Sequence, residues 1–215
     1  GGDANNATAQ YSSVAGGSTN VATGYAGAVG GGESNAVTQP YSVVSGGYGN
    51  SASGSWSVIG GGSGNSASGA WSVISGGSGN SASGWWSVIS GGYGNSALSA
   101  GMVGGGFWNT AGWWGTVAGG VGNLAGFGAT VAGGGGTTDE NSLFIVVPGH
   151  RAAGPWSAIG GGFASTASAA YSVISGGKEN AVSGYATVVS GGDANNATAQ
   201  YSSVAGGSTN VATGY

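Results

Sequence analysis

The sequence predicts an all-β fold: a parallel β-solenoid, or β-roll, built from stacked coils of about 15 residues each. Three observations predict this fold. Gly-Gly pairs recur at a nearly constant interval, each position of the interval keeps its chemistry, and glycine supplies 53 of the 215 residues. Glycine at this density disfavours helix. So short a period suits one turn of a solenoid, with two short strands and two corners.

Gly-Gly pairs mark the corners of the expected coils, because glycine adopts backbone conformations that other residues resist. The interval between pairs shortens by one residue from Gly91 to Gly133 and then returns to its first value. The pairs begin at Gly1, Gly16, Gly31, Gly46, Gly61, Gly76, Gly91, Gly105, Gly119, Gly133, Gly161, Gly176, Gly191 and Gly206. The one wide gap, from Gly133 to Gly161, is twice the shorter interval and is interpreted as two coils, with Pro148 and Gly149 near the missing pair.

A ladder of β-branched residues is the expected core, since equal positions of stacked coils lie above one another at the strand spacing of ~4.8 Å. Val or Ile stands two residues before each pair. This core ladder comprises Val14, Val29, Val44, Ile59, Ile74, Ile89, Val103, Val117, Val131, Ile159, Ile174, Val189 and Val204. Alanine, usually six residues after the first glycine, lets the opposite wall approach. Asparagine, four residues after that glycine, can hydrogen-bond to itself along the stack.

A second, longer repeat lies above the first one. Residues Gly1–Tyr25 and Gly191–Tyr215 are identical. We call the interval from Gly1 to Gly191 the long period, and it is interpreted as 13 coils. We therefore expect residues 1–215 to form a single continuous solenoid with irregular coils at 137–155. Our hypothesis is that the chain is one long period plus an overlap of a tandem array. Each period would then rise about 62 Å, from thirteen coils at ~4.8 Å each.

Aromatic side chains often stand five residues before the Gly-Gly pair, and the alternation of a strand points them outward together with Val58 and Val73. The candidate lateral-association stripe comprises Tyr41, Trp56, Trp71, Trp86, Trp114, Trp156 and Tyr171. Lone soluble proteins rarely expose a long apolar stripe. We therefore predict self-association, by end-to-end continuation and by a lateral bundle or a homotrimer. Two alternatives stay open: a corner could shift the alternation and bury the rings, or the stripe could bind carbohydrate.

Charge is too sparse for several classes of function. The chain has 2 Lys+Arg, 6 Asp+Glu, one His and no Cys. Two cations cannot neutralise a run of phosphates, so we predict no nucleic-acid partner. No apolar run approaches the ~20 residues of a membrane helix, so we predict no membrane insertion. We also predict that the chain is not an enzyme and has no catalytic residue, no cofactor and no metal site.

Four polar residues near the irregular segment are the best candidates in the sequence for a binding or catalytic site. Asp139, Glu140, His150 and Arg151 flank the strand-like run 142–147. A binding knob or an acid/base site is one interpretation. The interpretation that we favour is a solvated loop, because adjacent carboxyl groups on a strand point to opposite faces and a surface ion pair contributes only about 0–1 kcal/mol.

Several units resemble a known family. YSVVSGGYGNSASG (Tyr41–Gly54), WSVIGGGSGNSASG (Trp56–Gly69) and WSVISGGSGNSASG (Trp71–Gly84) are similar to the head repeats of trimeric autotransporter adhesins, the YadA-like heads. The resemblance covers nearly the whole chain except about 137–155. It implies a parallel β-roll, possible trimers, a bacterial surface location, and binding to extracellular matrix or neighbouring cells.

These patterns together predict a structural protein that forms an extracellular or cell-surface fibre from stacked coils. The first alternative is an adhesin head with a glycan or matrix ligand. The second is an ice-binding solenoid, for which the chain offers a serine ladder over four coils. That ladder comprises Ser51, Ser66, Ser81 and Ser96.

Overall fold

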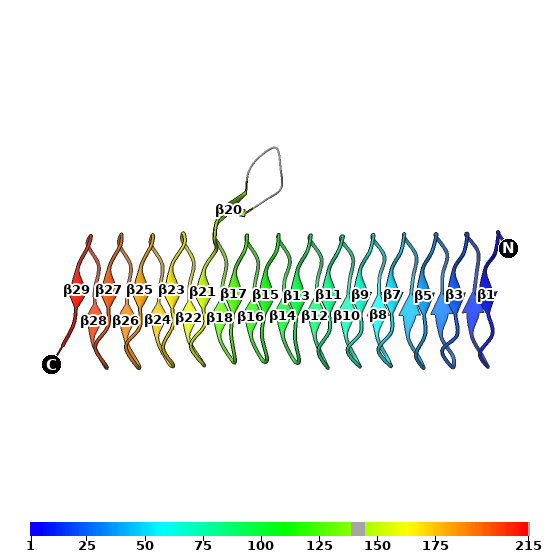
Figure 1. The fold of residues 1–215 in the computed structure, drawn as a ribbon, viewed down its shortest axis with the longest axis horizontal. Coiled ribbons are helices and arrows are strands. Elements are labelled where there is room, and N and C mark those ends of the chain that lie inside the picture. Colours follow the sequence, from blue (N-terminus) through cyan, green and yellow to red (C-terminus); the bar gives the residue numbers. More distant parts are fainter. Residues whose placement is uncertain (139–144, 215) are drawn as a thin grey trace. The chain divides into compact units, whose positions relative to one another are not determined.

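The computed structural model describes residues 1–138 and 145–214, and the side chains of 1–137 and 148–214. The chain forms two compact units, Gly1–Gly105 and Gly106–Tyr215, which are described separately. Each unit is a stack of coils with two strands per coil (Figure 1). The predicted fold class, an all-β parallel solenoid, is confirmed. None of the described residues belongs to a helix that could cross a membrane. A single solenoid over 1–215 stays a prediction.

Two parallel sheets form the walls of the first unit. One sheet contains β1 (Asn6–Ala7), β3 (Val21–Ala22), β5 (Ala36–Val37), β7 (Ser51–Ala52), β9 (Ser66–Ala67), β11 (Ser81–Ala82) and β13 (Ser96–Ala97). The other contains β2 (Ser13–Val14), β4 (Ala28–Val29), β6 (Val43–Val44), β8 (Val58–Ile59), β10 (Val73–Ile74), β12 (Val88–Ile89) and β14 (Met102–Val103).

The second unit repeats this arrangement. Its first sheet contains β15 (Thr110–Ala111), β17 (Leu124–Ala125), β21 (Arg151–Ala152), β23 (Thr166–Ala167), β25 (Ala181–Val182), β27 (Asn196–Ala197) and β29 (Val211–Ala212). Its second sheet contains β16 (Thr116–Val117), β18 (Thr130–Val131), β22 (Ala158–Ile159), β24 (Val173–Ile174), β26 (Val188–Val189) and β28 (Ser203–Val204).

Within each unit, the strands of the two parallel sheets pair in register with the equivalent strands of the next coil. Ser66 pairs with Ser81, and Ala67 with Ala82, in the first sheet. The pairing extends to the Gly-Gly corner, where Ser63 forms a single parallel bridge with Ser78. Equal positions of successive coils are thereby held above one another, as the sequence period predicts.

The core is the narrow space between the two sheets, and the Val/Ile ladder lies in it. Apart from Val14 and Val204, the ladder residues are at most 1% exposed. Val14, in the first coil, is half-buried, and Val204 is 7% exposed. The facing wall is built from alanine, with Val37 and Val182 in two coils, and it is equally buried except at Ala7 and Ala212 in the end coils. Burial of an Ile side chain stabilises by about 1.5–3 kcal/mol.

The strand pairing on the two sides of the interval 133–160 corrects one sequence prediction. Leu124 of β17 pairs directly with Arg151 of β21, and Val131 of β18 pairs directly with Ile159 of β22. The wide interval from Gly133 to Gly161 is therefore one coil with an insertion, and the interpretation as two irregular coils is wrong. The insertion includes an antiparallel hairpin, β19 (Thr137–Thr138) with β20 (Ile145–Val147).

This correction also changes the coil count of the long period. Twelve Gly-Gly pairs begin from Gly1 to Gly176, and each of them starts one coil. The predicted thirteen coils are one too many. From Arg151 onward the coil is regular, because Ala153 N–H donates to the Ala167 carbonyl at 2.9 Å, as in other coils. The irregular stretch is thus shorter than the predicted 137–155.

Candidate functional site

An exposed corner lined by aromatic rings is the main candidate site of both units. We call it the aromatic corner: the turn of each coil that leads from the first sheet to the second. In the first unit it comprises Tyr11, Tyr25, Tyr41, Trp56, Trp71, Trp85 and Trp86. In the second it comprises Trp113, Trp114, Phe127, Trp156, Tyr171, Tyr185 and Tyr201. These side chains are 39–73% exposed.

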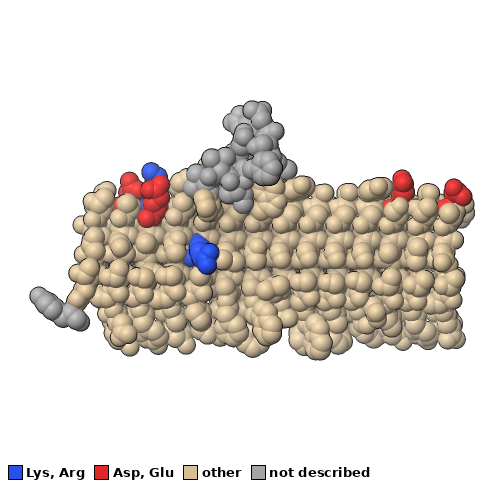
Figure 2. Space-filling view, in the orientation of Figure 1, with Lys and Arg blue, Asp and Glu red and all other residues tan. Residues whose placement is uncertain are grey.

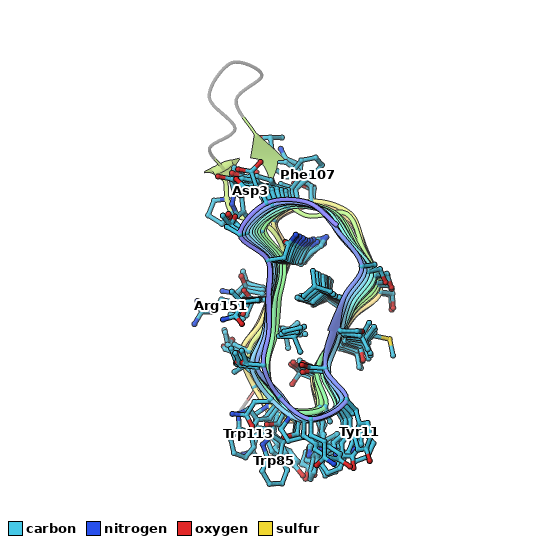
Figure 3. The ribbon with its side chains drawn as sticks, turned by 90° about the vertical axis from the view of Figure 1, so that its right-hand side faces the viewer. Asp3, Tyr11, Trp85, Phe107, Trp113 and Arg151 are labelled. Carbon is cyan, nitrogen blue, oxygen red and sulfur yellow. The ribbon has the colours of Figure 1, made fainter. Side chains whose placement is uncertain are left out.

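The rings point away from the core at this corner. Figure 3 shows Tyr11 and Trp85 projecting from the corner opposite Asp3 in the first unit, and Trp113 from the corner opposite Phe107 in the second. All seven residues of the predicted lateral-association stripe lie here. The alternative in which a corner buries the rings is wrong, because Trp56 and Trp71 are each 46% exposed.

The backbone at this corner is unfavourable for aromatic residues. Trp56 and Trp71 have φ of 63° and 56°, in the left-handed region. Bulky residues rarely adopt this conformation, and glycine or asparagine would fit it better. The corner is held by hydrogen bonds such as Trp71 N–H to the Ser55 carbonyl at 2.9 Å. Aromatic side chains at strained positions point to a role for the rings rather than for the turn.

Tyr11 and Tyr201 stand at the predicted position five residues before the Gly-Gly pair, whereas five other rings of the corner were missed by the sequence prediction. They stand one residue earlier in the coil, at Tyr25, Trp85, Trp113, Phe127 and Tyr185. In three of these coils the next residue is Ala26, Gly128 or Ala186, so the ring has moved by one residue and not been lost. A small residue at the predicted position with an aromatic residue directly before it was therefore the signal that could have located these rings.

Neighbouring rings contact one another over parts of each stack. Tyr41 and Trp56 are stacked, with centroids 4.0 Å apart and planes 13° apart. Tyr25 meets Tyr41 edge to face, with centroids 5.4 Å apart. In the second unit Phe127 and Trp156 meet edge to face at 5.6 Å. Such pairs each add about 0.5–1.5 kcal/mol beyond the area they bury.

The outward side chains of the second sheet extend this apolar surface in the first unit. Val58 and Met102 are 37% and 49% exposed, and Val43, Val73 and Val88 are half-buried. They follow the aromatic corner by two residues in each coil. The first unit therefore presents an apolar surface over one corner and one sheet face.

Charged groups lie away from the aromatic corner. Asp3, Glu33, Asp193 and the pair Lys178 and Glu179 are exposed at the Gly-Gly corner of their coils. Figure 2 shows most of the red and blue atoms of each unit at this corner. The Lys178–Glu179 pair, with Nζ to Oε1 at 3.6 Å, is half exposed on both sides and contributes little. The aromatic corner is therefore uncharged among the described residues.

An asparagine ladder is buried beneath the Gly-Gly corner of each stack. Asn65 Nδ2 donates to Asn50 Oδ1 at 3.1 Å and to the carbonyls of Gly61 and Gly77 at 3.1 and 2.9 Å. Its Oδ1 accepts from the backbone N–H of Asn80 at 3.0 Å. Each asparagine thus ties its own coil to both neighbours.

His150 takes the place of asparagine in the coil that carries the hairpin. Its backbone N–H donates to Asn123 Oδ1 at 2.8 Å, and its Nδ1 accepts from the Ser165 N–H at 3.1 Å. The ring is fully buried, while Arg151 is exposed on β21. The two side chains therefore point to opposite sides of the wall. Asp139 and Glu140 lie outside the described residues.

Acidification is expected to destabilise the second unit through His150. Burial lowers the pKa of His150 below its ordinary value of 6.5, because the charged ring loses its hydration. Below pH 6.5 the unfolded chain binds a proton that the folded unit resists, so stability present above pH 6.5 is lost as the pH falls. The loss is up to about 1.4 kcal/mol per pH unit. Urea midpoints over a pH series measure it, and His150→Asn should remove this slope. An unchanged slope in that variant would contradict the assignment.

The described residues contain no group of three His, Cys, Asp or Glu side chains that could hold a metal ion. Fold and site together define a class: a β-solenoid with a solvent-exposed aromatic ladder. No protein-family model matches the chain, and no curated protein matches its sequence. The resemblance to adhesin heads stays a prediction.

Proposed function

We propose that this chain is a structural protein that builds an extracellular or cell-surface fibre by stacking the coils of a tandem-repeat chain. The fibre would be held together by the stacking of equivalent positions. Strands, asparagines and aromatic rings of one coil lie next to those of the following coil. Such stacks satisfy their own backbone hydrogen bonds and resist unfolding, as cross-β stacks do.

The observation that carries this proposal is the continuity of the stack where the repeated segment begins again. Val182 of β25 pairs with Ala197 of β27, and Val189 of β26 pairs with Val204 of β28, in the ordinary register. Asn195 N–H donates to Asn180 Oδ1 at 3.0 Å. The end of one long period is therefore a suitable base for the start of the next.

The aromatic corner supports lateral packing of such stacks. Its apolar groups repeat at the coil spacing of ~4.8 Å, and a second copy of the chain offers the same spacing. A sugar ring packs on an exposed aromatic face, whereas the stacked rings of Tyr41 and Trp56 cover one another's faces and leave their edges outward. At this stacked pair the geometry favours another protein stack over a glycan as the partner.

Cryo-electron microscopy of the native assembly tests the proposal. A continuous fibre is expected, with a layer line at ~4.8 Å and a longer repeat near about 58 Å, from twelve coils. A short discrete rod of three chains would contradict the fibre and favour the adhesin head, and binding assays against matrix proteins and glycans would follow.

Removing three rings is expected to abolish lateral packing without unfolding the coils. The variant combines Trp56→Asn, Trp71→Asn and Trp86→Asn, since asparagine tolerates the left-handed backbone. Light scattering and fibre width by electron microscopy report association, and circular dichroism reports the fold. Ser51→Asn, Ser66→Asn and Ser81→Asn, on the opposite sheet face, form the matched control. Bundles that persist with the ring variant would exclude the aromatic corner as the lateral interface.

A further inference from the structure

We propose that the tyrosines of the aromatic corner are sites of oxidative coupling, which joins neighbouring coils through dityrosine bonds. The first unit carries three successive tyrosines, Tyr11, Tyr25 and Tyr41, and the second carries Tyr171, Tyr185 and Tyr201. We call these the tyrosine triads. The chain has no cysteine, so disulfides are not available to it as covalent bonds between coils.

Distance supports coupling within each triad. In the first unit the ring centroids of Tyr11 and Tyr25 are 5.5 Å apart, and those of Tyr25 and Tyr41 are 5.4 Å apart. In the second unit the centroid distances are 5.5 Å from Tyr171 to Tyr185 and 5.8 Å from Tyr185 to Tyr201. Each central tyrosine therefore contacts two possible partners.

Exposure gives an oxidant access to these rings and gives the rings room to turn. Tyr11 and Tyr201 are 71% and 73% exposed, and the central rings Tyr25 and Tyr185 are 39% and 41% exposed. The pairs meet edge to face, with planes 74–87° apart. Coupling needs the two ring edges to meet, and rotation of exposed side chains about their Cα–Cβ and Cβ–Cγ bonds can bring them together.

The reaction balances with a peroxide as oxidant. Each phenol loses one electron and one proton to give a tyrosyl radical. The two radicals form a carbon–carbon bond between ring positions ortho to the hydroxyl oxygen, and loss of the two ortho hydrogens as protons, which are regained at the oxygens, restores both phenols. In total two tyrosines and one hydrogen peroxide give one dityrosine and two waters. A haem peroxidase is an enzyme class that carries out these one-electron oxidations with peroxide.

Tyr48 provides a natural contrast within the same chain. It lies at the Gly-Gly corner, is 57% exposed, and has Glu33 and Ser63 as its bridge partners in the adjacent coils. Its neighbours in the ladder are thus not tyrosines. Accessibility alone would label Tyr48 as readily as Tyr41, so selective coupling of the triads would reflect their geometry.

The biological use of this chemistry rests on the proposed fibre, whereas the chemistry itself needs only a folded chain. The test is therefore done on dilute full-length protein with horseradish peroxidase and hydrogen peroxide, before any fibre forms. Dityrosine fluorescence gives the yield, and mass spectrometry of proteolytic fragments identifies the joined residues by the loss of two hydrogens per bond. We expect bonds from Tyr25 to Tyr11 or Tyr41, and from Tyr185 to Tyr171 or Tyr201.

The decisive variant combines Tyr25→Phe and Tyr185→Phe with Tyr215→Phe, because Tyr215 is the sequence equivalent of Tyr25 in the repeated segment. Phenylalanine keeps the ring and its packing but forms no phenoxyl radical, and the outer tyrosines of a triad are two coils, roughly 10 Å, apart. Loss of bonds within the chain is expected, while Tyr48→Phe should leave their yield unchanged. Undiminished coupling in this triple variant, or bonds spread equally over Tyr48, would overturn the proposal. A fibre that fails to form would leave this result intact and would count against the proposed function instead.

Discussion

Gly77→Ala is expected to disrupt the coil stack of the first unit, with a loss of about 3 kcal/mol or more in the free energy of unfolding. Gly77 has φ of 90°, and a Cβ there would lie 2.8 Å from the amide nitrogen of Gly92 and even closer to its carbonyl oxygen. That oxygen accepts hydrogen bonds from Ser78 N–H at 2.9 Å and Asn80 Nδ2 at 3.0 Å. The clash adds to the cost of holding a residue with a Cβ in the left-handed backbone region, which is roughly 1–2 kcal/mol.

Two nearby glycines separate these effects. A Cβ at Gly76 meets nothing within 4 Å and φ there lies outside the range from +20° to +160°, so Gly76→Ala should be neutral. A Cβ at Gly79 also meets nothing within 4 Å, but φ is 64°, so Gly79→Ala should show the strain alone. Urea unfolding measures all three variants. Equal midpoints for Gly76→Ala and Gly77→Ala would refute the close approach of successive coils at this corner.

Asn65→Ala is the second substitution expected to have a large effect. It removes donors from the Gly61 and Gly77 carbonyls and an acceptor from Asn80, all beneath the Gly-Gly corner. A buried polar group left without a partner costs about 1–3 kcal/mol. The Gly61 carbonyl and the Asn80 N–H both lose a partner, while the Gly77 carbonyl keeps the Ser63 N–H at 3.0 Å, so we expect a loss of about 2–5 kcal/mol.

Ser66→Ala and Asn196→Ala are the controls for this loss. Ser66 follows Asn65 directly and points outward, and Asn196 is an exposed asparagine beside the buried Asn195. Both should stay within about 0.5 kcal/mol of the parent chain. Hydrogen exchange should show faster opening in the coils next to Asn65, because each coil of a solenoid contacts only its neighbours. Equal loss in Asn65→Ala and Asn196→Ala would falsify the role of the ladder.

The period of the sequence was sufficient to predict the fold, because each position of a solenoid coil repeats its environment. Val or Ile before the Gly-Gly pair marks the core, as at Ile74, and asparagine after it marks the buried polar ladder, as at Asn80. The coil count was wrong for a numerical reason. The gap from Gly133 to Gly161 equals two of the shorter intervals, such as the one from Gly105 to Gly119, so an insertion has the length of an extra coil.

Counting backwards from Gly161 would have located the insertion. Asn65 stands eleven residues before its next Gly-Gly pair, and His150 stands eleven residues before Gly161. Ala67 and Ala152 agree in the same way, at nine residues. The strand pairing shows this alignment directly. A count of four residues forward from Gly133 instead places Thr137 at the position of the asparagine ladder. The rings one residue earlier, such as Tyr25, were missed because a turn, unlike a strand, lets two successive side chains point outward.

The hairpin shows what this architecture tolerates. The coil that carries it still pairs on both sides, from Leu124 to Arg151 and from Arg151 to Thr166. Register is thus set by the strands, and the length of the Gly-Gly corner is free to change. Such a corner is a grafting position, at which a foreign peptide could be displayed at fixed intervals along an otherwise unchanged scaffold.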